Sequence, residues 1–266
     1  MKFETLLYEK QDGVATLTLN RPESFNAFNT QMAGELHAAW TEIKRDPEVV
    51  CVVVTGAGPK AFCTGMDVAE IAESDTEARA NDSYEESPFT KLTAIHNRCW
   101  KPVITAVNGM VVGGGLHFVA DADLILAAEH ATFFDTHVKV GLVAGLEPVG
   151  LARRMPLEAV LRMALLGGSE RLGAQEAKAL GLVGEVLPAE QLLPRAQELA
   201  AKIAQHSPTA LARSKQAIWE SLDAGLEPGL RRAWEIIGEH GSHPDMNEGA
   251  AAFVEKRKPR WAGFSD

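Results

Sequence analysis

Apolar positions in the first part of the chain switch between two spacings. Two runs with strand-like patterning flank Asp12-Gly13 in LLYEKQDGVATLTLN, and this dipeptide is typical of a tight turn between antiparallel strands. Further on, Met32, Leu36 and Ile43 recur at helical spacing together with Ala39 and Trp40. The pattern therefore predicts a hairpin followed by an amphipathic helix.

Continuous apolar runs rich in β-branched residues predict strands that are buried on both faces. The runs VVCVVVT and KPVITAV each lead into a glycine-bearing loop and then into a segment that starts a helix, DVAEIAE or LHFVADA. A strand, a glycine loop and a helix thus recur near residues 49–72 and 103–122. LTAIHNRCW is predicted to be helical, and LILAAE and ATFFD to be short strands.

Strands nearly vanish after about residue 155, where helical segments separated by Gly or Pro follow one another. Their many Ala and Leu positions suit packing in a bundle or against another subunit. We expect a mixed α/β core over residues 1–195 and a C-terminal helical region over residues 196–266. The polar, acidic stretch at residues 73–90 is interpreted as a mobile loop or a partly ordered lid.

Composition narrows the class of protein. The chain has 266 residues, of which 46% are hydrophobic, so it can bury a sizeable core. Its net charge of −10 disfavours nucleic acid as a partner, and no apolar run is long enough to suggest a membrane span. The start of the chain shows no export signal, and the cysteines are scattered without metal-ligand spacing. These features predict a cytoplasmic protein with reduced thiols and without a metal site.

Two glycine-bearing loops carry the candidate chemistry. One contains Thr64-Gly65-Met66-Asp67 and the other Gly113-Gly114-Gly115, and each runs from a buried strand into a helix. Amides at the start of a helix lack intrahelical acceptors, and glycine lets a ligand approach them closely. Two such N–H groups aimed at one point would stabilise an oxyanion. The dinucleotide fingerprint GxGxxG and the phosphate-loop motif are absent from the sequence.

Successive blocks of the chain resemble the enoyl-CoA hydratase/isomerase family, also called the crotonase superfamily. The blocks are NRPESFNAFN, GAGPKAFCTGMDVAEI, KPVITAVNGMVVGGGLHFVADADLILAAEHATFFD, LGGSERLGAQEAKALGLVGEVLP and EGAAAFVEKRKPRW. The resemblance implies a spiral of ββα units, a C-terminal helical trimerisation region, and assembly as a homotrimer or as a hexamer built from two trimers. It also implies a coenzyme A thioester as substrate and no covalently bound cofactor.

The resemblance carries specific roles onto this sequence. It implies that the amides of Thr64 and Gly114 bind the thioester carbonyl oxygen. It implies contacts with coenzyme A along two segments and from the basic tail of a neighbouring subunit. The residues at the matching positions are Ser24, Asn26, Ala27, Cys63, Gly65, Met66, Asp67, Phe253 and Lys256.

This sequence departs from the family pattern at the two positions where hydratases carry glutamate. His117 stands two residues after the glycine triplet, and His137 stands four residues after the phenylalanine of ATF. Imidazoles can act as acid or base near neutral pH, and the helix dipole at His117 disfavours its charged form. A carboxylate on His137 would raise its basicity. Glu147, where the family often has glycine, is ranked above Asp135 for that role.

Three functions follow as alternatives. The first is an acyl-CoA enzyme, either a hydratase or an isomerase, that stabilises a thioester enolate and moves protons with His117 and His137, with Glu147 as the candidate catalytic partner of His137. The second is a hydrolase, because some relatives cleave cyclic β-diketones with a histidine and an acidic residue. The third is a non-catalytic acyl-CoA binder. The sequence leaves the acyl group, and trimer versus hexamer, open.

Overall fold

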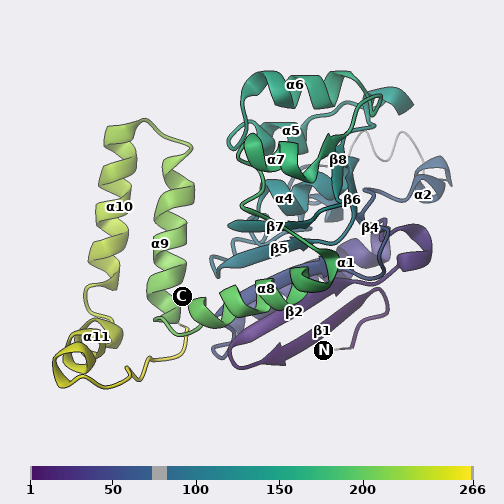
Figure 1. Ribbon diagram of the computed structural model, residues 1–266. Coiled ribbons are helices and arrows are strands. Elements are labelled where there is room, and N and C mark those ends of the chain that lie inside the picture. Colours follow the sequence, from purple (N-terminus) through teal and green to yellow (C-terminus); the bar gives the residue numbers. More distant parts are fainter. Residues whose placement is uncertain (1, 74–82, 265–266) are drawn as a thin grey trace.

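The computed structural model describes residues 2–73 and 83–264 of the chain (Figure 1). Much of the stretch interpreted as a lid, residues 74–82, lies outside the described residues. Within the described part, no helix is both long and apolar enough to cross a membrane.

Strands of the described residues form two sheets (Figure 1). The larger has the order β1-β2-β3-β5-β7-β10, and the smaller has the order β4-β6-β8-β9. Their bounds are β1 Leu6–Gln11, β2 Val14–Leu19, β3 Cys51–Gly56, β4 Ala61–Cys63, β5 Val103–Val107, β6 Met110–Val112, β7 Leu124–Ala128, β8 Thr132–Phe134, β9 Leu172–Gly173 and β10 Glu185–Leu187.

The strands pair in the directions that the predicted hairpin and the recurring strand, loop and helix units require. β1 and β2 are antiparallel, and the turn between them places Asp12 at φ 49° and Gly13 at φ 80°, which suits a tight hairpin. From β2 onward, β2, β3, β5, β7 and β10 pair in parallel. In the smaller sheet β4, β6 and β8 pair in parallel, and β9 is antiparallel to β8. The predicted hairpin and buried strands are therefore confirmed, and the recurring strand, loop and helix build an α/β spiral.

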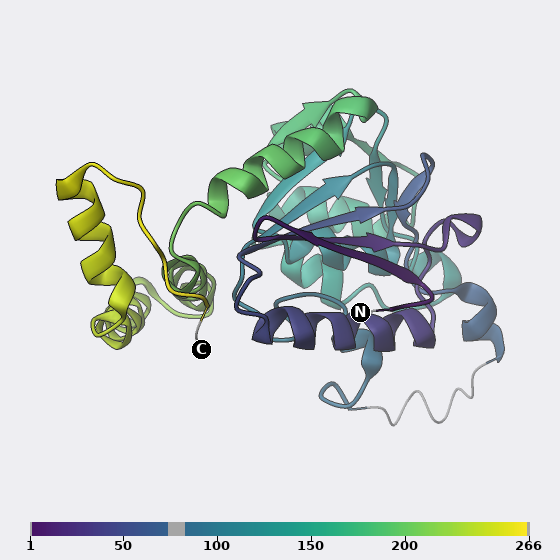
Figure 2. The ribbon, with the colours of Figure 1, turned by 90° about the horizontal axis from the view of Figure 1, so that it is seen from below.

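Helices cover both faces of the larger sheet (Figure 2). α1 is capped by Asn29, whose side chain accepts from the Met32 amide at 2.9 Å, and it buries Trp40, as the spacing predicts. The helices are α1 Thr30–Arg45, α2 Val68–Glu73, α4 His117–Ala120, α5 Leu146–Leu151, α6 Leu157–Leu165, α7 Ala174–Ala179, α8 Ala189–Ile203, α9 Pro208–Ser221, α10 Leu226–His240 and α11 Pro244–Glu255.

α8 belongs to the core. Its buried Leu192, Ala196 and Ala200 pack on apolar side chains of the larger sheet, on the face opposite α1 (Figure 2). The predicted boundary between residues 195 and 196 falls inside this helix. The helical region that extends away from the core therefore begins with α9.

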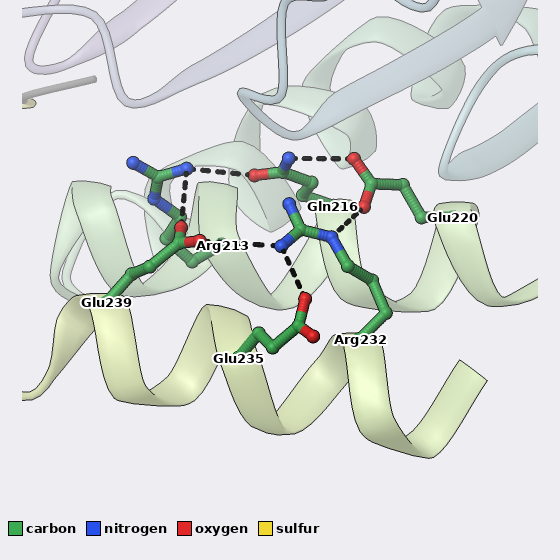
Figure 3. A network of polar contacts seen from close by, with 6 residues as sticks. All are labelled: Arg213, Gln216, Glu220, Arg232, Glu235 and Glu239. Carbon is green, nitrogen blue, oxygen red and sulfur yellow. Dashed lines mark hydrogen bonds and ion pairs between the residues drawn. The ribbon is translucent and has the colours of Figure 1, made fainter. Parts of the chain in front are cut away.

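α9, α10 and α11 extend to one side of the core (Figures 1 and 2). A network of charged side chains joins α9 to α10: Arg232 reaches Glu220 at 2.9 Å and Glu239 at 3.4 Å (Figure 3). α9 is tied to the core by Asp123, whose carboxylate accepts from Lys215 and Trp219, each at 2.8 Å. This attachment holds α9 beside the starts of β5 and β7, because Asp123 also accepts from the amide of Val103, the first residue of β5.

The segment LTAIHNRCW is not a helix, contrary to the prediction. It forms turns that end at Arg98, whose φ of 50° is left-handed. The Asn97 side chain donates to the carbonyls of Lys91 and Thr93, both at 2.8 Å, and so competes with helical hydrogen bonding.

A buried lysine provides a test of how the core is held together. Lys101 is 1% exposed and its ammonium donates to the carbonyls of Ile43 and Asp46, at 2.7 and 2.5 Å. We expect Lys101→Met to lower the free energy of unfolding by about 1–3 kcal/mol, because both buried acceptors lose their donor. Urea unfolding measures this, with Lys178→Met at an exposed position as control. Equal midpoints for the two variants would contradict the assigned role.

Candidate active site

A cavity of about 270 Å³ opens where three segments of the smaller sheet meet. Each segment follows a parallel strand, so the carboxyl ends of β4, β6 and β8 face the same hollow. The lining includes Thr64, Gly65 and Met66 after β4, Gly113 and Gly114 after β6, and Thr136, His137, Val140 and Leu142 after β8. The structure therefore brings together the two glycine loops and one predicted catalytic histidine.

The glycine loops touch through their backbones. A Cβ atom on Gly115 would lie 2.4 Å from the Cys63 carbonyl oxygen, and one on Gly65 would lie 2.9 Å from the Gly114 nitrogen. Gly65 also has a φ of 86°, which side chains rarely tolerate. Gly114 is the second residue of the 3-10 turn Gly113–Leu116, and early amides of a helical turn lack acceptors within it. Only glycine at these positions permits so close a contact.

His137 is paired with Asp135. The Asp135 carboxylate lies 3.0 Å from His137 Nδ1 and accepts from the His137 backbone amide at 2.8 Å. Asp135 is fully buried, and its hydrogen bond raises the pKa of His137. The interpretation that ranked Glu147 above Asp135 as the partner of His137 is wrong, because the residue two positions back at the strand end reaches the same ring. Nδ1 donates to the carboxylate, which leaves the lone pair of neutral His137 on Nε2.

Glu147 lies between the two predicted histidines. Its Oε1 is 3.3 Å from Nε2 of His117 and 4.0 Å from Nε2 of His137. Burial raises the pKa of the Glu147 carboxyl and lowers the pKa of His117 to about 4. The His117–Glu147 contact therefore involves a neutral imidazole and is no ion pair. Burial is the main cause of this low pKa, which favours the neutral ring that was expected from the sequence.

A second histidine–aspartate pair lies behind His117, and the sequence interpretation missed it. His96 Nε2 is 3.3 Å from Asp121 Oδ2, and the His96 and His117 rings meet edge to face at 5.0 Å. Thr93 donates to the same carboxylate oxygen at 2.7 Å. The four-residue separation of His117 and Asp121 on a predicted helix was a signal that both face the same side. No such signal pointed to His96.

The two segments assigned to coenzyme A are adjacent. The Phe28 amide donates to the Gly65 carbonyl at 2.8 Å, and the Asp67 amide donates to the Phe28 carbonyl at 2.9 Å. Several residues of these segments have structural partners. Asn26 is fully buried and donates to the carbonyls of Ala57 and Ala61, and Asp67 pairs with Arg21 at 2.9 Å.

Of the other residues that were predicted to contact coenzyme A, some are buried and some are exposed. Cys63 and Ala27 are buried, burial raises the pKa of the Cys63 thiol to about 12, and Ser24 is partly exposed. Phe253 is 86% exposed near the end of α11, and Lys256 follows it in a left-handed conformation. α11 and α2 lie at opposite ends of the molecule, so the tail does not reach its own cavity (Figures 1 and 2).

Comparison with known proteins identifies the family of enzymes to which this fold and this site belong. The family described as enoyl-CoA hydratase/isomerase matches residues 9–264, and the chain belongs to it. (E)-benzylidenesuccinyl-CoA hydratase of Thauera aromatica is 35% identical over 96% of this chain and 98% of its own. Short-chain-enoyl-CoA hydratase of Clostridium acetobutylicum is 34% identical over 97% of each.

Solved structures agree with this assignment. An enoyl-CoA hydratase/isomerase from Mycobacterium paratuberculosis superposes with a TM-score of 0.87 at 39% identity, covering 97% of this chain and 98% of its own. An enoyl-CoA hydratase from Bacillus anthracis superposes with a TM-score of 0.90 at 30% identity, covering 98% and 100%. The expected α/β crotonase fold is therefore confirmed. The chain is an enzyme of the hydratase/isomerase type that acts on acyl-CoA substrates.

The contact between the glycine loops makes Gly115 a critical position. We expect Gly115→Ala to destroy the cavity and the fold around it, because the new methyl group would overlap the Cys63 carbonyl. Thermal unfolding and binding of butyryl-CoA by calorimetry measure the loss. Gly173→Ala is the control, since nothing lies within 4 Å of its Cβ position. Normal stability and binding in Gly115→Ala would refute the packing argument.

Proposed function

We propose that the protein hydrates an α,β-unsaturated acyl-CoA, with His137 and Glu147 as the proton-transfer pair. The observation that carries this proposal is the 4.0 Å separation of His137 Nε2 and Glu147 Oε1, with His137 at the cavity that the glycine loops line. This distance is too long for a direct hydrogen bond. One water oxygen can lie about 2.8 Å from both atoms at once, which is ordinary hydrogen-bond geometry.

The glycine loops hold the substrate. We assign the thioester carbonyl oxygen to the amides of Thr64 and Gly114, both of which line the cavity. Donors placed there stabilise the enolate oxygen more than the ground-state carbonyl, and so lower the barrier to addition. Coenzyme A would follow Ser24, Asn26 and Ala27 and the residues from Cys63 to Asp67.

Two groups exchange protons with the substrate and water: His137 accepts a proton and Glu147 donates one. Neutral His137 takes a proton from water at Nε2 as the water oxygen bonds to the β-carbon, and the electrons of the double bond move to the thioester oxygen. Burial raises the pKa of Glu147, so its protonated form is easier to populate than that of an exposed carboxyl group, and we assign this form the transfer of a proton to the α-carbon. Afterwards a second water returns a proton from His137 to Glu147 across the 4.0 Å gap.

His117 acts through Glu147 in this scheme. Its Nε2 contacts Glu147 Oε1 at 3.3 Å, and its low pKa keeps it uncharged throughout. A charged His117 would pull Glu147 into its ionised form and remove the acid. A neutral imidazole holds the carboxyl group in place without fixing its charge.

Hydrolysis is the second candidate, and the Asp135–His137 pair favours it. An imidazole backed by a buried carboxylate can activate water against a carbonyl carbon, and the same oxyanion site would hold the tetrahedral intermediate. In hydrolysis, unlike hydration, the bond from the carbonyl carbon to sulfur or to carbon breaks, and the leaving group takes a proton. Free coenzyme A or a cleaved acyl chain would be the product.

We also propose a homotrimer, or two such trimers, built through the C-terminal helices. Large apolar side chains are exposed on this region, including Leu226 at 81% and Trp234 at 73%, and burial against another copy would remove them from water. Phe253 and Lys256 could then reach the coenzyme A of a neighbour. The three cysteines are free and buried, which fits the cytoplasm.

Turnover of enoyl-CoAs tests the proposed reaction. Loss of the conjugated thioester absorbance is followed with crotonyl-CoA and longer chains. We expect Glu147→Gln and His137→Ala each to lower kcat by about 10²–10⁴-fold, the usual range for one proton-transfer group, with butyryl-CoA binding retained. Glu158→Gln, on an exposed surface, is the control.

Each other result points away from hydration. No turnover by the wild-type protein at any chain length excludes it. Release of free thiol with a saturated or unsaturated acyl-CoA supports the hydrolase instead. If the wild type binds butyryl-CoA but shows neither turnover nor thiol release, only an acyl-CoA binder remains. Variants at Glu147 and His137 that keep the turnover of the Glu158 control would exclude these two residues as the proton-transfer pair.

The Asp135–His137 pair predicts the pH dependence. His137 must be neutral to accept a proton, so kcat/KM falls as the pH drops through its raised pKa, which lies above the ordinary 6.5. In Asp135→Asn the hydrogen bond to the charged ring weakens, and we expect the acid midpoint to move to lower pH with a smaller plateau. Asp12→Asn removes the same formal charge on an exposed turn and should leave the midpoint in place. An unmoved midpoint in Asp135→Asn would exclude His137 as the base.

A further inference from the structure

Behind His117, on the side away from the cavity, lies a group of polar side chains that the proposed reaction does not use. His96 and Asp121 keep only 11% and 13% of their side-chain exposure, and Thr93 is 4% exposed. They come from two places in the chain, the turn at residues 92–98 and the end of α4. Burying a carboxylate and an imidazole costs free energy unless they are paired, so their arrangement needs a reason.

Hydrogen-bond accounting assigns the proton on His96. Asp121 Oδ2 accepts from the Thr93 hydroxyl at 2.7 Å and lies 3.3 Å from His96 Nε2. The carboxylate offers acceptors only, so the hydrogen of neutral His96 is on Nε2. His96 Nδ1 is buried without a partner among the described residues. Among the described residues, Asp121 is therefore the charged group beside the Nε2 side of the ring.

The His96 ring packs against the His117 ring. The two rings meet edge to face, with centroids 5.0 Å apart and planes at 77°. His117 Nε2 lies 3.3 Å from Glu147 Oε1. Charged or titratable groups reach His117 from each neighbouring element: Asp121 on its own helix, His96 from the turn, His137 after β8 and Glu147 on α5.

We infer that His96 and Asp121 are positioning residues that fix the His117 ring against Glu147. This inference rests on the proposed function, in which His117 acts by holding Glu147. Asp121 fixes the tautomer and plane of His96, and the His96 ring blocks His117 from turning away from the carboxyl group. Like the Asp135–His137 pair, it consists of an aspartate carboxylate beside an imidazole, but it lies further from the cavity. It presents an edge to another imidazole instead of a lone pair to a water molecule.

Crystal structures and kinetics of three variants test this assignment. His96→Leu removes the donor and the flat ring, His96→Gln keeps an N–H group for Asp121, and Asp121→Asn removes the charge. We expect His96→Leu and Asp121→Asn to lower kcat about tenfold to a hundredfold, typical of lost supporting contacts, with little change in KM. His96→Gln should recover part of that loss. In the crystals, the contact of His117 Nε2 with Glu147 should lengthen most in His96→Leu.

The control is His130→Gln, an exposed histidine that contacts the carbonyls of Pro59 and Asn108 away from the cavity. Binding of butyryl-CoA should remain in all variants, which separates misplacement of His117 from loss of the fold. The inference is overturned if His117 keeps its contact with Glu147 in both His96→Leu and Asp121→Asn, or if their kcat equals that of the control. If the wild-type protein shows no turnover, the proposed function is overturned. The crystal structures of the variants would still test whether His96 and Asp121 position His117.

Discussion

The backbone contact between the two glycine loops is the constraint on which the rest of the site depends. Gly115 packs so closely on the Cys63 carbonyl that a single methyl group does not fit. This contact brings the ends of β4 and β6 together and sets where α4 begins. His117 is the first residue of that helix, so its position follows directly from the contact. Any looser approach of the loops would move His117 relative to Glu147, which comes from a separate element.

Burial then decides the charge of each group at the site. Water is largely excluded around His117 and Glu147, and desolvation disfavours both an imidazolium and a carboxylate. His137 differs because a hydrogen bond to buried Asp135 outweighs the effect of its own burial. The pKa of His117 is therefore lowered, whereas the pKa values of Glu147 and His137 are both raised. A neutral imidazole thus lies beside the carboxyl group, and a more basic imidazole lies across from it.

Most of the fold was predictable from local pattern, since each signal acts over a few residues. The Asp12-Gly13 turn, the buried strand runs and the spacing of α1 need no distant partner to be recognised. The turn at residues 92–98 could not be predicted from local pattern. There the Asn97 side chain donates hydrogen bonds to backbone carbonyls that would otherwise be acceptors within a helix. Pattern also did not show that α8, which contains the expected boundary after residue 195, packs on the sheet.

Residue type and order by themselves determined the family, the glycine loops and the histidines at positions 117 and 137. The sequence could determine these features because the need for glycine in a loop and the apolar pattern of a buried strand are both visible within a short segment. Only the tertiary structure decided which carboxylate serves which imidazole. Asp135 pairs with His137, Glu147 turns to His117, and His96 with Asp121 lies behind them. These partners lie on separate elements or at a bend in the chain, and their contacts depend on angles and separations of a few ångströms that no spacing in the sequence encodes.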